Sequence, residues 1–210
     1  MRQQFASDNN AGMCPTALRA LIEANDAGHA LGYGGDRWTT AACDAIRKLL
    51  EAPKAEVFLV YNGTAANALA LAHLCRPYHA VVAHAFSHVE TDEAGATGLF
   101  SGGTTIMSAD EPAAKLTPAG VERLATKYGR GFHHVKPAAL SITQSTELGT
   151  VYSLDELKAL TATARRHDLM VHMDGARFAN AVATLGLAPA DISWRAGVDV
   201  LSLGGVKNGL

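Results

Sequence analysis

From residue 56 onward, short apolar runs alternate with longer segments rich in alanine and leucine. The apolar runs predict strands at residues 56–61, 80–84, 104–108, 138–144, 169–174 and 198–203. The segments between them predict helices at residues 64–75, 89–96, 117–128, 153–167 and 176–185. Apolar strands that alternate with helices favour an α/β fold whose mostly parallel sheet is covered on both faces.

The first 55 residues follow a different pattern. Two amphipathic stretches, 15–24 and 39–51, flank a glycine-rich loop at 28–36 before any strand is predicted. We therefore expect an N-terminal arm with lead-in helices at 1–55, followed by one large domain at 56–210.

Composition and charge exclude several classes of protein. The chain has 210 residues, 48% hydrophobic and 18% charged, as in an ordinary globular protein. Its net charge is -2 and its longest basic run is Arg165-Arg166-His167, so neither nucleic acid nor a membrane surface is indicated as a partner. The three cysteines match no metal or disulfide spacing. With no signal-peptide pattern and no apolar stretch of membrane-spanning length, the sequence predicts a soluble cytoplasmic protein without a metal.

A lone acid closes one predicted strand, and a lysine follows the next. Asp174 comes directly after the apolar run at 169–173, and Lys207 follows the run at 198–203. One helix and one strand separate them, so both are expected at the carboxyl edge of a parallel sheet. A lysine that can form a Schiff base and a carboxylate that keeps a pyridine nitrogen protonated indicate pyridoxal phosphate chemistry. The alternative for Lys207 is a solvated loop lysine.

Polar residues also follow the first two predicted strands. Gly63 and Thr64 open a helix, where backbone amides, a hydroxyl and the helix dipole suit a phosphate; a simple helix cap is the alternative. No Walker lysine and no G-x-G-x-x-G is present, which disfavours a nucleoside triphosphatase or a dinucleotide enzyme. His88 follows the next strand and could stack on a flat ring or exchange protons near neutral pH, unless it only caps a helix.

An arginine lies close to Asp174 in the sequence. Arg177 follows it by three residues and offers a fork of donors for a cofactor oxygen or a substrate carboxylate. Its alternative role is an ion pair that compensates a buried Asp174.

Seven sequence blocks carry a resemblance to a known family. In chain order they are FASDNNAG (5–12), GYGGD (32–36), NGTAAN (62–67), SHVETDE (87–93), TQSTELGT (143–150), HMDGAR (172–177) and GGVKNG (204–209). Together they resemble the low-specificity L-threonine aldolases, which belong with the β-eliminating lyases to the aminotransferase-like, fold type I pyridoxal phosphate enzymes. The resemblance spans the whole chain and implies a three-layer large domain.

The resemblance implies roles for the candidate residues. Lys207 would form the Schiff base, Asp174 would contact the pyridine nitrogen, and His88 would stack on the ring. Gly63 and Thr64 would hold the phosphate.

Three more residues would contact the cofactor or the substrate. Arg177 would bind the cofactor oxygen or the substrate carboxylate, assisted by Ser7, and Tyr33 would line the site from a neighbouring subunit. His88, or a water that it holds, is the first candidate base and His133 the second. The resemblance leaves the roles of Gln144 and Glu147 open.

The chain departs from the family pattern in two places. Val206 stands before the lysine, where family members commonly have a hydroxyl residue. The sequence ends at Leu210, whereas the family continues into a smaller C-terminal domain. That domain is expected to be missing, and the chain is expected to be a fragment.

The implied reaction is retro-aldol cleavage of L-threonine, L-allo-threonine and related β-hydroxy amino acids to glycine and an aldehyde, through an external aldimine with pyridoxal phosphate. Two alternatives stay open: another fold type I enzyme, such as a β-eliminating lyase or an aminotransferase, and an inactive fragment. The complete enzyme is expected to be a homodimer or homotetramer acting on a small amino acid.

Overall fold

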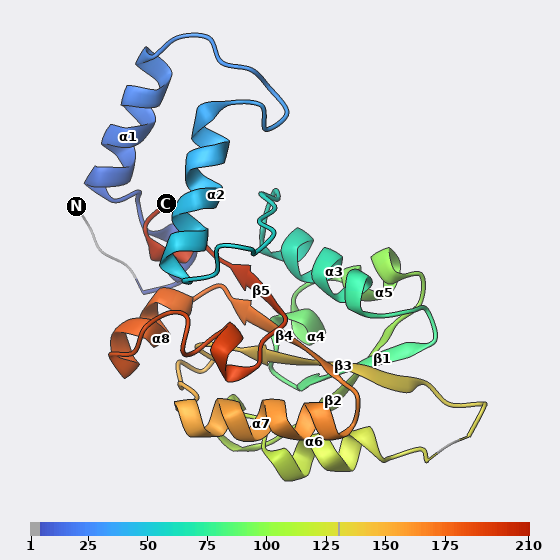
Figure 1. Cartoon of the computed structure of the whole chain (residues 1–210). Helices are drawn as coiled ribbons and strands as arrows, with labels where there is room; N and C mark the ends of the chain where they lie inside the picture. Colours follow the sequence, from blue (N-terminus) through green and yellow to red (C-terminus); the bar gives the residue numbers. More distant parts are fainter. Residues whose placement is uncertain (1–4, 130) are drawn as a thin grey trace. The chain divides into compact units, whose positions relative to one another are not determined.

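The computed structural model describes residues 5–129 and 131–210 (Figure 1). The chain divides into two compact units. The first comprises the described residues up to Leu59 together with Gly204–Leu210, and the second comprises Val60–Leu203. Lys207 therefore belongs to the first unit, and Asp174 to the second.

A parallel sheet forms the centre of the second unit. Its strands are β1 (His79–His84), β2 (Thr105–Ala109), β3 (Lys136–Thr143), β4 (Met170–Gly175) and β5 (Val200–Leu203). The strand order is β2-β1-β3-β4-β5, and all neighbouring strands run parallel. Asp174 is in register with Thr143 on β3 and Ser202 on β5, so the carboxyl ends of these three strands form one edge.

Helices cover both faces of this sheet. They are α3 (Gly63–Leu74), α4 (His88–Thr91), α5 (Ala96–Ser101), α6 (Pro118–Ala125), α7 (Leu154–Arg166) and α8 (Phe178–Leu185), with short 3-10 helices at Pro112–Ala114 and Trp194–Ala196. Helices α3 and α5 lie on one side of the sheet, and α6 and α7 lie on the other (Figure 1). The predicted three-layer α/β fold with a parallel sheet is confirmed. Among the described residues, no helix is long and apolar enough to cross a membrane.

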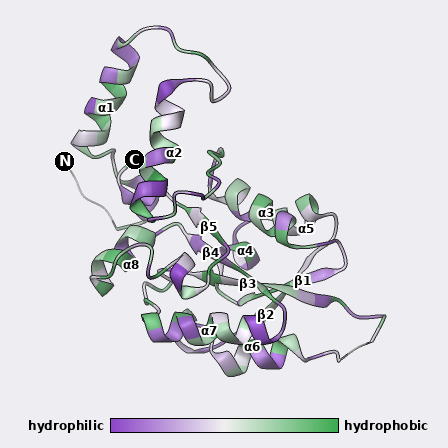
Figure 2. Ribbon diagram, viewed as in Figure 1, coloured by the Kyte–Doolittle hydropathy of each residue, from purple (hydrophilic) through white to green (hydrophobic). Residues whose placement is uncertain are grey.

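Local sequence signals explain where these helices begin. The Asn62 side chain accepts a hydrogen bond from the Ala65 amide at the start of α3. Ser153 and Glu156 form the predicted capping box at the start of α7. Helices α6 and α7 show hydrophilic and hydrophobic residues side by side (Figure 2), and Leu157 and Leu160 of α7 are fully buried. Amphipathic helices of this kind bury their apolar face against a sheet.

A charged clamp holds the amino ends of β4 and β5. The Asp199 carboxylate accepts hydrogen bonds from both Arg165 terminal nitrogens, each at 2.8 Å, and from the Val171 amide at 2.7 Å. Arg165 also donates to the carbonyl oxygens of Leu169 and Gly197. This bidentate pair, which we call the Arg165–Asp199 clamp, joins α7 to two strands at the edge opposite Asp174.

The first unit contains α1 (Pro15–Asp26) and α2 (Arg37–Leu49), with 3-10 helices at Asp8–Asn10 and Val206–Asn208. Asp36 caps α2 by accepting hydrogen bonds from the Trp38 and Thr39 amides at 2.9 and 2.8 Å. The Cys14 amide donates to the Gly209 carbonyl at 2.9 Å, so the segment that carries Lys207 is bonded to the start of α1.

Two predictions of secondary structure are wrong. Residues 56–61 form no strand; Phe58, Leu59 and Tyr61 are 79%, 58% and 97% exposed. A strand needs a hydrogen-bonded neighbour, and the described strands pair only with one another. The single helix predicted at 89–96 is divided into α4 and α5, because Ala94 and Gly95 adopt left-handed conformations with φ of 50° and 76°.

Candidate active site

Asp174 lies at the carboxyl end of β4, as the apolar run before it predicts. It is buried, and each of its carboxylate oxygens accepts a hydrogen bond: Oδ2 from Asn67 Nδ2 at 2.8 Å and Oδ1 from the Ala176 amide at 2.9 Å. Both donors are neutral, so they orient the carboxylate without cancelling its charge.

Asn67 connects Asp174 to a second buried acid. Its Nδ2 also donates to Glu93 Oε1 at 2.8 Å, and His88 Nδ1 lies 2.8 Å from the same oxygen. The Glu93 side chain is fully buried, whereas 36% of the His88 side-chain surface is exposed. Asp174, Asn67, Glu93 and His88 therefore form a continuous hydrogen-bonded chain, which we call the Asp174–His88 network.

Burial controls the protonation of Glu93. It raises the pKa of this carboxyl, while the hydrogen bonds from His88 and Asn67 lower it and the nearby Asp174 charge raises it further. Glu93 Oε2 and Asn67 Oδ1 are buried without a hydrogen-bond partner. Two acids joined through one amide thus occupy the same buried region, and burial with the neighbouring Asp174 charge favours the neutral form of Glu93.

A buried histidine on β4 links this strand to both of its neighbours. His172 lies two residues before Asp174 on β4, so its side chain is on the same face of the sheet. Its Nδ1 is 2.9 Å from Ser141 Oγ on β3, and its Nε2 is 2.9 Å from Ser202 Oγ on β5. Burial lowers the pKa of His172 well below 6.5, although the Asp174 charge opposes the shift, so the ring is neutral at pH 7.

The neutral state of His172 leads to a testable prediction. Its carbon-bound proton resonances in NMR spectra should stay unchanged as pH falls from 8 through 6.5. Because the folded-state pKa lies below the unfolded-state value, the free energy of unfolding should begin to fall once pH drops below about 6.5. A His172 titration midpoint near 6.5 would contradict the burial argument.

The predicted phosphate residues lie on the helix that also carries Asn67. Gly63 and Thr64 form the first turn of α3, and Asn67 is three residues beyond Thr64. A Cβ added at Gly63 would meet no atom within 4 Å, so this helix start is open to a ligand. The same helix thus presents amide groups for an anion and holds the carboxylate of Asp174.

Residues after β3 and β4 complete this edge. Glu147 Oε1 accepts hydrogen bonds from the His88 amide at 2.8 Å and from Thr143 Oγ1 at 3.1 Å, which fixes the loop after β3 against α4. Arg177 is half-buried at the N-cap of α8. Gln144 exchanges two 3.0 Å hydrogen bonds with the Tyr152 backbone, a structural contact.

Three predicted site residues belong to the first unit. Lys207 lies in the 3-10 helix Val206–Asn208 and is half-buried. Ser7 accepts a hydrogen bond from the Asn9 amide at 3.2 Å, and Tyr33 is exposed with φ of 60°. Their roles at the site remain predictions.

His133, the second candidate base, lies at the opposite edge of the sheet from Asp174 of the same unit. His133 is exposed in the loop that precedes β3, whereas Asp174 is in register with Thr143 at the far end of that strand. The length of β3 therefore separates the two side chains, and His88 is the candidate base that the structure places in the network.

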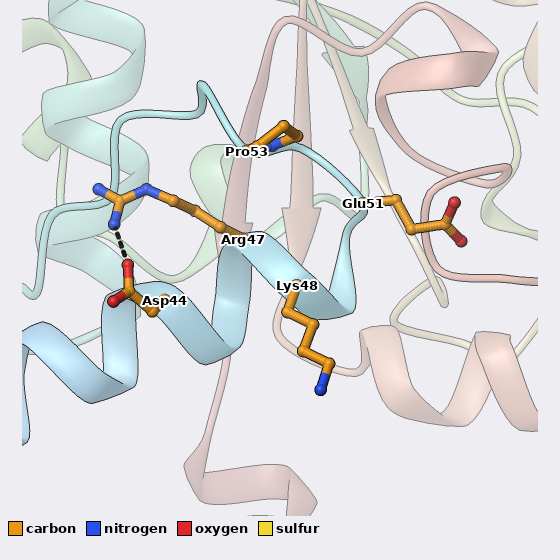
Figure 3. A pocket seen from close by; sticks show the side chains of 5 residues that line it. All are labelled: Asp44, Arg47, Lys48, Glu51 and Pro53. Carbon is orange, nitrogen blue, oxygen red and sulfur yellow. Dashed lines mark hydrogen bonds and ion pairs between the residues drawn. The ribbon is translucent and has the colours of Figure 1, made fainter.

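The first unit has a charged surface hollow of its own at the end of α2. It has a volume of about 430 Å³ and is lined by Asp44, Arg47, Lys48, Glu51 and Pro53 (Figure 3). Arg47 and Asp44 form a 2.8 Å ion pair one helical turn apart. None of the predicted site residues lines this hollow, and we assign it no ligand.

Comparison with known proteins identifies the family. The model of the beta-eliminating lyase family matches residues 4–210. The chain belongs to the beta-eliminating lyase family.

Two threonine aldolases resemble the chain, and an aminotransferase shares its fold. The chain is 53% identical over 208 residues to the low specificity L-threonine aldolase of Pseudomonas aeruginosa, covering 99% of this chain and 59% of that protein. It matches the structure of Leishmania major threonine aldolase with a TM-score of 0.89 and 35% identity, over 97% of this chain and 58% of the other. An N-succinyldiaminopimelate aminotransferase from Mycobacterium tuberculosis shares the fold, with a TM-score of 0.58, 22% identity and coverage of 80% and 43%. The chain thus spans less than two thirds of the proteins it matches.

Sequence reasoning missed two members of the Asp174–His88 network. Glu93 and Asn67 stand at the ends of two of the sequence blocks that carry the resemblance, but nothing in their spacing indicates that they meet. The acid five residues after the candidate base His88, in the same sequence block, is the signal that could have drawn attention to Glu93.

Proposed function

We propose that the chain carries the pyridoxal phosphate site of an L-threonine aldolase, which cleaves L-threonine and related β-hydroxy amino acids to glycine and an aldehyde. The observation that carries the proposal is the buried Asp174 carboxylate, held by two neutral donors beside a half-exposed histidine. The 53% identity to the Pseudomonas aeruginosa L-threonine aldolase supports the choice of reaction.

The side chains of the second unit fit this cofactor. Asp174 would contact the pyridine nitrogen, His88 would lie against the ring, and Gly63 and Thr64 would bind the phosphate at the open start of α3. Bound pyridoxal phosphate supplies a protonated ring that accepts the electrons of the bond being broken. Lys207 of the first unit would supply the amine that binds the cofactor aldehyde.

The electrostatics around Asp174 favour a cationic partner. The Asn67 amide and the Ala176 backbone leave the negative charge of the carboxylate in place. His172, the nearest histidine on the same strand, is neutral because burial lowers its pKa, so it does not compete as a cation. A buried carboxylate in these surroundings stabilises a protonated ring nitrogen.

His88 and the substrate-binding residues have separate roles. His88 is half-exposed and would take the proton from the substrate hydroxyl, directly or through a water. Arg177 would bind the substrate carboxylate with help from Ser7 and Tyr33. For Tyr33 we propose a site in a neighbouring copy, which requires a homodimer or homotetramer.

Product analysis tests the proposal against its nearest rival. With pyridoxal phosphate added, the chain should release acetaldehyde and glycine from L-threonine. Because the family is that of the beta-eliminating lyases, elimination is the second candidate, and it would release pyruvate from L-serine. Pyruvate without acetaldehyde would replace aldol cleavage by elimination. Neither product, in a chain that binds the cofactor, would refute both activities.

A further inference from the structure

Glu93 is buried beside the histidine to which the proposed function gives the proton transfer. Its side chain is fully buried, and Oε1 lies within 2.8 Å of both His88 Nδ1 and Asn67 Nδ2. Glu93 lies beyond the end of α4, in the bend that precedes α5. The main chain thus turns at this point and brings a buried acid back against the histidine that starts α4.

The hydrogen-bond partners of Glu93 Oε1 indicate which atom carries the proton between Glu93 and His88. Asn67 Nδ2 has two hydrogens and donates one to Asp174 Oδ2 and one to Glu93 Oε1. The reversed amide would direct its oxygen at two carboxyl groups, which is unfavourable. Glu93 Oε1 therefore accepts from Asn67, and an ionised carboxylate oxygen in this position also accepts from His88 Nδ1. These contacts favour a proton on Nδ1 in the hydrogen bond between Oε1 and the imidazole.

We propose that Glu93 is a positioning residue that fixes His88 as the Nδ1–H tautomer, so that Nε2 is the unprotonated, proton-accepting nitrogen. Asn67 holds Glu93 in place by bridging it to Asp174. The inference rests on the proposed function in that His88 then acts through Nε2 on the bound substrate. The position of the proton on the ring, however, is a property of the chain itself.

A buried carboxyl in contact with Nδ1 has two effects on the histidine. It orients the ring, because the Oε1 contact restricts rotation about the side-chain bonds. It also selects the basic nitrogen, because the nitrogen that donates to the acid is not available as a base. The His88 amide is held separately by Glu147 at 2.8 Å, so the backbone and the ring of this residue are each fixed by one acid.

The tautomer can be measured without cofactor or substrate. Two-bond ¹H–¹⁵N NMR spectra of protein with ¹⁵N-labelled histidine, at a pH where His88 is neutral, separate protonated from unprotonated ring nitrogens; the His88→Gln spectrum assigns the signals. We expect Nδ1 of His88 to be protonated and Nε2 to be bare. A proton on Nε2 in the unsubstituted protein would overturn the proposal, whatever the activity.

Three variants separate positioning from a structural role. Glu93→Gln keeps an acceptor at Oε1 and should keep the Nδ1–H tautomer, whereas Glu93→Leu removes it and should shift the population towards Nε2–H. Glu90→Leu, an exposed acid on α4, is the matched control and should behave like the unsubstituted protein. If the chain cleaves L-threonine, Glu93→Leu should lower kcat at least tenfold with little change in KM. An unchanged tautomer of His88 in folded Glu93→Leu would refute the proposal. If Glu93→Leu does not fold, loss of the Nδ1–H tautomer in Glu93→Gln would refute it instead.

Discussion

Lys207→Ala is expected to lower the kcat of aldol cleavage at least about 10⁴-fold, as when a covalent nucleophile is lost. The physical reason is that the amine of Lys207 is the proposed attachment point of the cofactor aldehyde. Borohydride reduction after addition of pyridoxal phosphate, followed by peptide mapping, should find the modified lysine at position 207 in the unsubstituted chain. The variant should carry no modification there.

Two further substitutions make this result specific. Lys207→Arg keeps a positive charge but cannot form the bond, so it should be as inactive as the alanine variant. Lys158→Ala, at an exposed position on α7, should keep full activity and full labelling of Lys207. If the reduced cofactor maps to another lysine, the assignment of Lys207 is wrong.

Asp174→Asn is expected to lower turnover of L-threonine by more than about 10⁴-fold, beyond the range typical of a lost general base. The substitution keeps the shape of the side chain but removes the negative charge that favours a protonated pyridine nitrogen. Steady-state kinetics should show the loss in kcat, while borohydride labelling should show that Lys207 still binds the cofactor.

An acid just before the same strand provides a control for Asp174. Asp168 precedes β4 at its amino end, is exposed, and adopts a left-handed conformation with φ of 56° that asparagine also tolerates. Asp168→Asn should therefore leave activity and stability unchanged. Nearly full turnover in Asp174→Asn with bound cofactor would show that this carboxylate is not the partner of the ring.

The fold could be predicted from sequence where the signal is local. Apolar runs predicted β1 to β5, and the Ser153–Glu156 capping box predicted the start of α7, because each depends on residues close together in the chain. The strand expected at 56–61 failed because strand formation depends on a neighbour that is remote in sequence. The break between α4 and α5 was not predicted because the sequence does not reveal that Ala94 adopts a left-handed conformation.

The candidate site, too, was predicted from the sequence only in part. The position of Asp174 at the end of β4 followed from the apolar run before it. The start of α3 at Gly63 followed from local sequence alone, because the strand expected before it does not form. The contacts of Glu93 and Asn67 did not, because they join α3 to the bend between α4 and α5 through side chains. A list of candidate catalytic residues does not reveal the buried groups that orient them.

The Arg165–Asp199 clamp has a practical consequence. It ties α7 to the amino ends of β4 and β5, whereas every member of the Asp174–His88 network lies towards the carboxyl edge. Protein engineers seeking greater heat tolerance could therefore vary side chains around the clamp and screen them for solubility alone. Asp174, at the carboxyl end of β4, lies away from those positions.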